Sequence, residues 1–298
     1  MTEAARDYPC DICRSTETVP IEATRNYTKG QAYFVCTHCG FVHARTRRSA
    51  KAIADAWSKE VFGGSYTKTT YTARIPHVKA RQTFVAETLE TEIPGGLKGK
   101  SLCDIGAGEG QFLDIVRSGG YGASAFGIEP SEHNGKILAS NKFEHFVGSI
   151  EDWCASPLSE SRRFDVVTIM WTLENCTDCR GMIGAAYDAL VPGGYICVAT
   201  GSRILVPFKK PLQYFLGNGE PIDLHAFHFS ANSLTNLLAV CGFERTFINR
   251  YIDNDILCMI GRKAERKGDA SLKKDDHKAI IAFFDRWAAE TRNFYADA

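Results

Sequence analysis

The sequence has no run of apolar residues near the roughly 18 that a membrane-spanning helix needs. Its first residues, MTEAARDYPCD, lack the apolar segment of a secretory signal peptide. It also lacks net charge, because 35 basic residues balance 35 acidic ones, so global electrostatics give no argument for a nucleic-acid or membrane partner. These absences predict a cytoplasmic protein without a membrane partner.

The composition is that of a globular chain with more than one unit. A length of 298 residues exceeds a typical single domain, and 44% hydrophobic with 23% charged residues is enough to close a core. Eleven cysteines are an odd number spread along the chain, which favours reduced thiols and metal ligation over a disulfide framework.

Four of these cysteines form two close pairs near the N-terminus. Cys10 and Cys13 make one CxxC pair, and Cys36 and Cys39 make a second. Four thiolates in this spacing suit a tetrahedral zinc ion, and four protein ligands leave no open coordination position. We therefore predict that residues 1–48 form a zinc-binding module in which the metal is structural.

Helical patterns follow this module over residues 49–96. Apolar residues recur with helical spacing from Ile53 to Val61 and again from Val78 to Leu89, before the helix-breaking Pro94–Gly96 segment. We interpret residues 49–96 as a helical connector that contributes to a substrate site.

Strand-like apolar runs alternate with helical stretches over residues 97–263. Such alternation predicts an α/β fold with a parallel sheet built from βαβ units. Prolines among aromatic residues interrupt the pattern at 201–229, which we interpret as a lid insert. Residues 264–298 combine a charged stretch with an amphipathic helix, whose apolar face we expect to pack on the molecule's own sheet or in a homodimer.

A glycine-rich loop, Gly106–Gly110, occurs where the first of these strands turns into a helix. Gln111 stands where the GxGxxG motif for dinucleotides requires its last glycine, which weakens a nicotinamide interpretation. Asp104 can accept hydrogen bonds from an amino group or a bridging water. Glu129 ends the next strand, where its carboxylate can accept hydrogen bonds from both hydroxyls of a ribose. The pattern indicates a ribose-bearing cofactor.

Five motifs in this region occur in a recognisable order: DIGAGEG at 104–110, GIEP at 127–130, GSIEDW at 148–153, FDVVTIMWTLEN at 164–175 and LVPGGYICVAT at 190–200. In order and spacing they resemble the motifs of class I S-adenosylmethionine-dependent methyltransferases, over about residues 98–262. The resemblance implies a Rossmann-like domain with a mostly parallel seven-stranded sheet, and S-adenosylmethionine as cofactor.

The resemblance also assigns roles. The glycine loop would hold the methionine and ribose portions of the cofactor, Glu129 the ribose hydroxyls, and the residues after the third and fourth strands the adenine and the sulfonium. Asn175 stands where the family often has a histidine, so no role is built on that position. The cofactor-binding residues implied in this way are Asp104, Gly106, Ala107, Gly108, Gly110, Glu129, Ser149, Ile150, Met170 and Trp171.

Methyl transfer to a hydroxyl or a carbon acid needs a base, which we expect near the lid. The segment DLHAFHFS at 223–230 resembles the His-x-x-x-Phe-Ser stretch of bacterial methyltransferases that act on sugars, some of which carry an N-terminal four-cysteine zinc domain. This resemblance implies a sugar or nucleotide-sugar substrate and a catalytic base at His225, with His228 as a second candidate. For the acceptor atom we favour oxygen, that is, O-methylation. The competing interpretation of the two histidines is that they form a buried, hydrogen-bonded pair without a catalytic role.

Other functions stay open. C-methylation of a nucleotide-linked keto sugar is disfavoured, because Leu224 precedes His225 where the corresponding zinc-containing enzymes have a glutamate. A non-catalytic binding scaffold is disfavoured by the intact glycine loop and ribose acid.

A local excess of positive charge lies over residues 45–81, where nine basic residues face only Asp55 and Glu60, for a balance of +7. Tyr66, Tyr71 and Arg74 within it are predicted to bind a phosphorylated or nucleotide-linked sugar. Nucleic acid would also favour such a patch, but the chain lacks the Asn/Asp-Pro-Pro-aromatic motif of amino-methylating enzymes, so nucleic acid is the less favoured partner.

Overall fold

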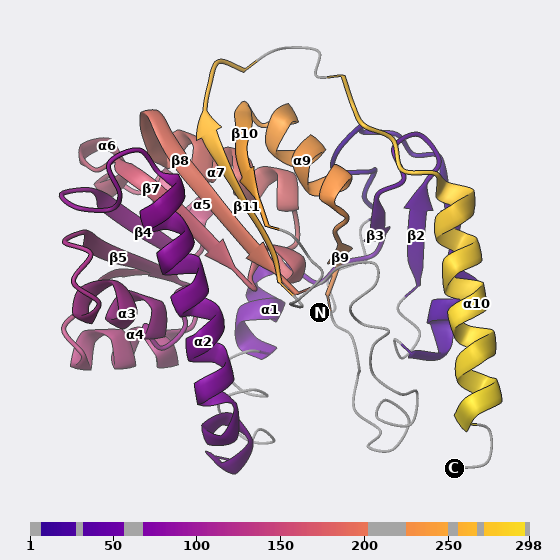
Figure 1. Cartoon of the computed structure of the whole chain (residues 1–298), viewed down its shortest axis with the longest axis horizontal. Coiled ribbons are helices and arrows are strands. Elements are labelled where there is room, and N and C mark those ends of the chain that lie inside the picture. Colours follow the sequence, from indigo (N-terminus) through magenta and orange to yellow (C-terminus); the bar gives the residue numbers. More distant parts are fainter. Residues whose placement is uncertain are drawn as a thin grey trace.

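A computed structural model of the chain describes residues 7–27, 32–56, 68–201, 225–249, 256–266 and 271–295, and two β-sheets organise these residues (Figure 1). The larger sheet has seven strands in the order β10-β11-β8-β7-β4-β5-β6, and the smaller has four in the order β1-β2-β3-β9. The two sheets lie side by side, with β9 between the larger sheet and β3 (Figure 1).

The larger sheet is parallel except for β11, which runs antiparallel to both of its neighbours. Its strands are β4 (Ser101–Ile105), β5 (Ser124–Glu129), β6 (Glu144–Val147), β7 (Phe164–Met170), β8 (Leu190–Thr200), β10 (Phe243–Ile248) and β11 (Leu257–Lys263). The middle strands β4, β7 and β8 are rich in Val, Ile and Cys and are buried on both faces, as parallel strands under helices are. The predicted α/β fold with a mostly parallel seven-stranded sheet is confirmed.

Helices cover both faces of this sheet. Their bounds are α2 (Lys68–Glu92), α3 (Gln111–Ser118), α4 (Glu132–Ser140), α5 (Ile150–Ala155), α6 (Leu158–Ser161), α7 (Cys179–Ala189) and α9 (Ala231–Val240). On one face Val85 and Leu89 of α2 pack on strand residues such as Leu102. On the other face Ile183 of α7 and Leu237 of α9 pack in a second cluster.

α2 is longer than its sequence pattern indicates. Apolar periodicity predicts a helix only from Val78 to Leu89, whereas α2 begins at Lys68 and continues through Pro76. Pro76 is exposed, and the polar residues before it have no apolar face to reveal them. Within the described ranges, no helix combines the length and the apolar character that crossing a membrane requires.

The smaller sheet joins two distant parts of the chain. Its antiparallel strands are β1 (Thr18–Pro20), β2 (Tyr33–Cys36), β3 (Val42–Ala44) and β9 (Phe227–His228). In the register, Val42 pairs with His228 and His43 with Phe227, and the Ala44 N–H donates to the carbonyl of Ala226 at 2.8 Å. The end of the predicted lid insert is therefore a strand of the N-terminal sheet. A 3-10 turn η1 (Glu22–Tyr27) lies between β1 and β2 in sequence, and a short helix α1 (Ala50–Ala56) follows β3.

The C-terminal helix α10 (His277–Tyr295) packs on the N-terminal sheet, at the edge of the molecule farthest from α2 (Figure 1). Its Ile280 and Phe284 join Tyr33 and Val35 in a separate small core. Just before the helix, the Asp275 carboxylate accepts hydrogen bonds from Ser230, the N-cap of α9, and from Asn232 at 2.7 Å. Ile280 and Phe284 of α10 are thus covered by the N-terminal sheet of the same chain.

Arg47, one of the nine basic residues in the segment 45–81, is not part of a surface patch. Its side chain is 1% exposed and forms a two-pronged ion pair with the Asp11 carboxylate, 3% exposed, at 2.6 and 2.9 Å. The guanidinium also donates to the Thr177 carbonyl and lies 4.4 Å from the ring centre of Phe227. Arg47 therefore ties the N-terminal module to β9 and to the loop before α7.

We expect Arg47→Met to destabilise the protein by about 3–5 kcal/mol, because it leaves the Asp11 carboxylate buried without its charge partner. The matched control is Arg45→Met, whose partner Asp7 is 58% exposed, and which should cost less than about 1 kcal/mol. Urea unfolding followed by circular dichroism measures both. Equal losses of stability in the two variants would contradict the structural role of the buried pair.

Candidate functional site

The glycine loop lies at the carboxyl end of β4, at the edge of the sheet where the parallel strands end. Gly106 has a φ of 78° and is packed tightly, because a Cβ there would lie 2.2 Å from the Thr172 hydroxyl. Gly108 has a φ of 56°, and a Cβ there would meet none of the described residues within 4 Å. Gly106 is thus required for packing between two loops, while Gly108 leaves open space above the backbone.

Glu129 ends β5 beside this loop and is tied to it. Its carboxylate accepts hydrogen bonds from the Gly108 N–H at 2.8 Å, the Ser131 N–H at 3.0 Å and the Asn134 side chain at 3.3 Å. Burial raises the pKa of Glu129, and the three hydrogen bonds act in the opposite direction. The predicted ribose acid is therefore held at the open side of the loop.

Asp104 lies inside the sheet, 3% exposed. Its Oδ1 accepts a hydrogen bond from the Thr168 hydroxyl of β7 at 2.6 Å. Burial raises the pKa of Asp104 to about 7, and the negative charge of Glu129 adds to this, while the bond from Thr168 opposes it. The contact that the structure shows for Asp104 is thus to the neighbouring strand.

Ser149 and Ile150 begin α5, after β6. Ser149 and Asp152 form a capping box in which each side chain accepts from the backbone N–H of the other, at 3.1 and 2.9 Å. Ile150 is 1% exposed and belongs to the large core. If these residues contact adenine as predicted, Ile150 does so through its backbone.

Met170 ends β7, and Trp171 directly follows it. Trp171 has a φ of 52°, a left-handed conformation that costs a non-glycine residue energy and is often found at functional sites. Two hydrogen bonds hold its backbone. The Trp171 N–H donates to the Ala199 carbonyl at 2.8 Å, and the Trp171 carbonyl accepts from the Asn175 side chain at 3.0 Å. Asn175, where the resemblance leads one to expect histidine, therefore fixes the backbone of Trp171.

His225 lies beside the turn that follows β7, at the same edge of the sheet as the glycine loop. The Ala226 N–H donates to the carbonyl of Glu174 at 2.8 Å, and the Tyr33 hydroxyl of β2 donates to the carbonyl of His225. Glu174 belongs to the 3-10 turn η3 (Leu173–Asn175). The backbone around His225 is thus held by the N-terminal sheet on one side and by the larger sheet's loop on the other.

His228 occupies a different environment. It lies in β9, is 3% exposed, and packs edge-on against the ring of Tyr33 with centroids 4.6 Å apart. The buried position of His228 fits the interpretation of a packed histidine better than it fits a contact with substrate. His225 is therefore the better candidate for the base.

The four cysteines of the N-terminal module converge. The Sγ atoms of Cys10 and Cys39, and those of Cys13 and Cys36, are 3.5 Å apart, and all four lie within 4.8 Å of one another. Tetrahedral zinc with bonds near 2.3 Å places sulfurs about 3.8 Å apart, so the donor set fits zinc.

Both CxxC pairs have the same turn. In each, the N–H of the residue that follows the pair donates a hydrogen bond to the carbonyl of the first cysteine of the pair. The Arg14 N–H donates to Cys10 at 2.9 Å, and the Gly40 N–H donates to Cys36 at 2.8 Å. Both of these residues have positive φ, 62° and 77°. At Gly40 a Cβ would also strike the Asp275 carbonyl at 2.4 Å, so glycine is needed for the C-terminal segment to lie against the module.

The predicted substrate residues are only partly described. Tyr66 lies outside the described residues, and of Tyr71 and Arg74 only the backbone is described, within α2. From the same basic segment, Arg81 of α2 places its guanidinium 5.8 Å from the ring centre of Trp171. α2 therefore brings one cationic side chain to the end of β7.

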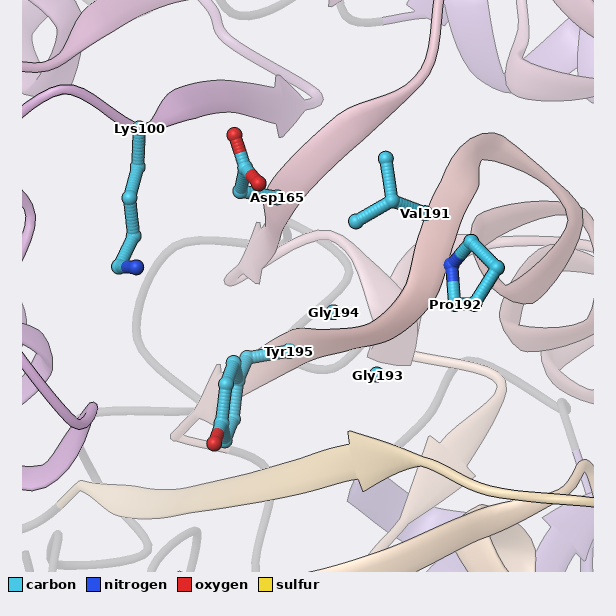
Figure 2. Close-up of a pocket in the computed structure, with 7 residues that line it drawn as sticks. All are labelled: Lys100, Asp165, Val191, Pro192, Gly193, Gly194 and Tyr195. Atoms are coloured by element: carbon cyan, nitrogen blue, oxygen red, sulfur yellow. The ribbon is translucent and has the colours of Figure 1, made fainter.

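A pocket of about 110 Å³ lies away from these residues (Figure 2). It is lined by Lys100, Asp165 and residues 191–195, at the amino ends of β4, β7 and β8. The Asp165 carboxylate already accepts from both the N–H and the hydroxyl of Ser101 at 2.8 Å. This pocket is at the opposite edge of the sheet and contributes nothing to the cofactor loop.

A family model described as "Methyltransferase domain" matches residues 77–246, more than half of the chain. The chain belongs to this methyltransferase-domain family. The matched residues include the glycine loop, Glu129, Trp171 and His225, and the predicted methyltransferase resemblance is confirmed at the level of the domain.

Curated relatives of the methyltransferase domain are distant. A ubiquinone biosynthesis O-methyltransferase from Thiobacillus denitrificans is 31% identical over 121 residues, which cover 39% of this chain and 49% of that protein. A demethylmenaquinone methyltransferase from Lactococcus lactis subsp. lactis is 28% identical over 132 residues, with 43% and 52% covered. The chain spans about half the length of the curated relatives it matches.

Solved structures share the fold of the methyltransferase domain. The plantazolicin methyltransferase BpumL, in complex with S-adenosylhomocysteine, aligns with a TM-score of 0.55 at 13% identity, covering 72% of this chain and 95% of that one. The 1,6-didemethyltoxoflavin-N1-methyltransferase of Burkholderia thailandensis aligns with a TM-score of 0.50 at 14% identity, covering 76% and 96%. At these identities the likeness concerns the fold.

The cofactor edge of the methyltransferase domain fits S-adenosylmethionine. The space above Gly108 accepts a ligand close to the backbone, and the buried Glu129 carboxylate beside it is a hydrogen-bond acceptor of the kind that ribose hydroxyls require. Trp171 directly follows β7, the strand next to β4, at the position where the sulfonium is expected. S-adenosylmethionine is the methyl donor of this domain.

Two contributors to the site have little or no signal in the sequence. Tyr33, whose hydroxyl holds the backbone of His225, has no local signal, since its partner lies 192 positions away. Glu174 has a weak one: it is an acidic residue directly after a strand, next to an apolar run, and yet it is 1% exposed.

Glu129→Ala should weaken S-adenosylmethionine binding by about 1–3 kcal/mol, or roughly 5- to 150-fold in Kd, because the ribose loses a charge-assisted acceptor. The control is Glu132→Ala, an exposed residue in the first turn of α4. Titration calorimetry measures both affinities. An unchanged Kd in the Glu129 variant would remove the ribose assignment.

Native mass spectrometry should find one zinc ion per chain, lost in Cys36→Ser because one of four thiolate ligands is gone. Cys154→Ser is the matched control, since Cys154 is exposed and outside the cluster. Retention of zinc by Cys36→Ser, or its absence from the wild-type protein, would contradict the predicted site.

Proposed function

We propose that the protein transfers the methyl group of S-adenosylmethionine to a hydroxyl oxygen of a sugar, nucleotide-linked or within a glycan, or of a similarly polar small molecule, with His225 as the general base. The observation that carries this proposal is the position of His225. It lies at the carboxyl edge of the parallel sheet, next to the turn after Trp171, where the acceptor must meet the cofactor. Imidazole titrates near neutral pH, which suits a base for a hydroxyl acceptor.

The chemistry divides between cofactor and protein. Bound S-adenosylmethionine supplies an electrophilic methyl group, so the protein must hold the acceptor and take its proton. In our proposal the hydroxyl proton goes to a ring nitrogen of His225. The electron pair of the O–H bond stays on oxygen, which attacks the methyl carbon while the sulfur keeps the electrons of the broken carbon–sulfur bond.

Three observations support a small molecule rather than nucleic acid as the acceptor, and the second of them points to a sugar. One of the curated relatives is named as an O-methyltransferase of ubiquinone biosynthesis, and another takes its name from demethylmenaquinone, so both are named for small molecules. Residues 223–230 together with the four-cysteine module resemble sugar methyltransferases. The basic segment is less suited to nucleic acid than its charge suggests, because Arg47 is buried and Arg45 is paired with Asp7.

The proposed zinc ion has a structural role. Four protein ligands leave the ion no open coordination position. Two of them, Cys36 and Cys39, lie at the turn between β2 and β3 and not at the glycine loop. In this proposal the metal stabilises the sheet that holds His225.

The substrate class is tested by incubating the purified protein with S-adenosylmethionine and a panel of nucleotide-linked sugars, followed by mass spectrometry of the sugars. The proposal expects a single added methyl group. A sugar deuterated at its ring carbons keeps all of its deuterium after O-methylation and loses one deuteron after C-methylation. Loss of deuterium would replace our proposal by C-methylation, and methylation of RNA but of no sugar would refute the substrate class.

His225→Asn should lower kcat by about 10²- to 10⁴-fold and leave the Kd of S-adenosylmethionine unchanged, because it removes the base but not the cofactor site. His277→Asn, at the start of α10, is the control. A loss of less than about threefold would demote His225 to a packing residue.

A further inference from the structure

Glu174 is a buried acid beside the segment that carries His225. It lies in η3 after β7 and is 1% exposed. Its Oε2 has no hydrogen-bond partner among the described residues. A buried carboxylate oxygen without a partner costs free energy, so Glu174 is a candidate for a functional role rather than a packing one.

The groups around the Glu174 carboxylate come from three separate elements. Thr200 and Gly201, at the end of β8, lie close enough to lower the pKa of the carboxylate. The segment that carries His225 reaches the same turn, where the Ala226 N–H donates to the Glu174 carbonyl at 2.8 Å. Burial raises the pKa of Glu174, and the His225 ring, Thr200 and Gly201 act against it. His225 is thus the titratable partner of Glu174 within the described chain.

Backbone hydrogen bonds hold the two residues together. The Glu174 carbonyl accepts from the Ala226 N–H at 2.8 Å, and the His225 carbonyl accepts from the Tyr33 hydroxyl. The segment that carries His225 is therefore attached directly to the turn that carries Glu174. Their proximity follows from this attachment and from the pairing of β9 with β3.

We propose that Glu174 is the positioning residue for His225: its carboxylate orients the imidazole and stabilises the imidazolium that forms when His225 takes the proton of the acceptor. This inference rests on the proposed function, in which His225 is the base. The proton itself moves only from the acceptor oxygen to the ring nitrogen, and Glu174 stays ionised. A carboxylate a few ångströms from an imidazole raises the basicity of that imidazole.

The inference is tested with Glu174→Gln, which keeps the size of the side chain and removes its charge. The first measurement is the pKa of His225 by NMR of the protein labelled in histidine, with its resonance identified by its loss in His225→Asn. We expect the pKa of His225 to fall by about 1–3 units in Glu174→Gln. Glu151→Gln, in α5, is the matched control and should leave it unchanged.

The second measurement is activity. We expect Glu174→Gln to lower kcat by about 10- to 100-fold with little change in the acceptor KM or in the Kd of S-adenosylmethionine, and to move the acidic limb of the pH profile of kcat to lower pH. Glu174→Asp, which restores the charge, should recover part of the loss.

The two measurements separate the claims. An unchanged pKa of His225 in folded Glu174→Gln would overturn the pairing, whatever the activity. A shifted pKa with no effect on kcat would keep the pairing and refute His225 as the base. If Glu174→Gln does not fold, the pKa of His225 is measured in Glu174→Asp instead. A value between the wild-type value and that of free histidine supports the pairing. A value equal to that of free histidine overturns it.

Discussion

The pairing of β9 with β3 is the interaction that fixes the position of His225, the base in our proposal. It consists of only two residue pairs, Val42 with His228 and His43 with Phe227. The pairing is reinforced by Phe41, which stacks on Phe227 with ring centres 5.9 Å apart, and by the buried Arg47 guanidinium over the same ring. Through it the N-terminal module holds the chain at His225, from where the Ala226 N–H reaches the turn after β7.

The two halves of the site rest on different kinds of structure. The cofactor half lies entirely within the parallel sheet. Glu129 at the end of β5 accepts a hydrogen bond from the N–H of Gly108, in the loop after β4. The proposed acceptor half lies between the two sheets, with Tyr33 from β2, Glu174 from η3 and His225 before β9. The first half needs only the methyltransferase domain. In our proposal the second needs the N-terminal module in place, so that a metal with a structural role would affect catalysis through the position of His225.

The parts of the fold that were predictable from sequence are those with a local signal. Strands such as Phe164–Met170 are long apolar runs, and α4 has its cap at Ser131 and its end after Ser140, so both could be placed correctly. The strands of the N-terminal sheet have two to four residues, too few for alternation to reveal them. The partner of β3 is also far along the chain, and no local pattern indicates it.

The candidate site divides in the same way. Glu129 was predictable because its distance from the glycine loop follows from the βαβ unit. The clustering of four cysteines follows from their spacing. The burial of Arg47 was not predictable, since a count of charges cannot reveal a partner at Asp11, 36 positions away. For the same reason Glu174 resembles an ordinary loop acid until the structure places His225 beside it.

We propose that the metal-bound N-terminal module holds His225 at the carboxyl edge of the parallel sheet. Hydrogen exchange followed by mass spectrometry, on the protein with and without a zinc chelator, tests it most directly. We expect peptides covering residues 33–44 and 225–230 to lose protection together on metal removal, while those covering 101–129 keep theirs. Unchanged protection of residues 225–230 in the metal-free protein would contradict the claim.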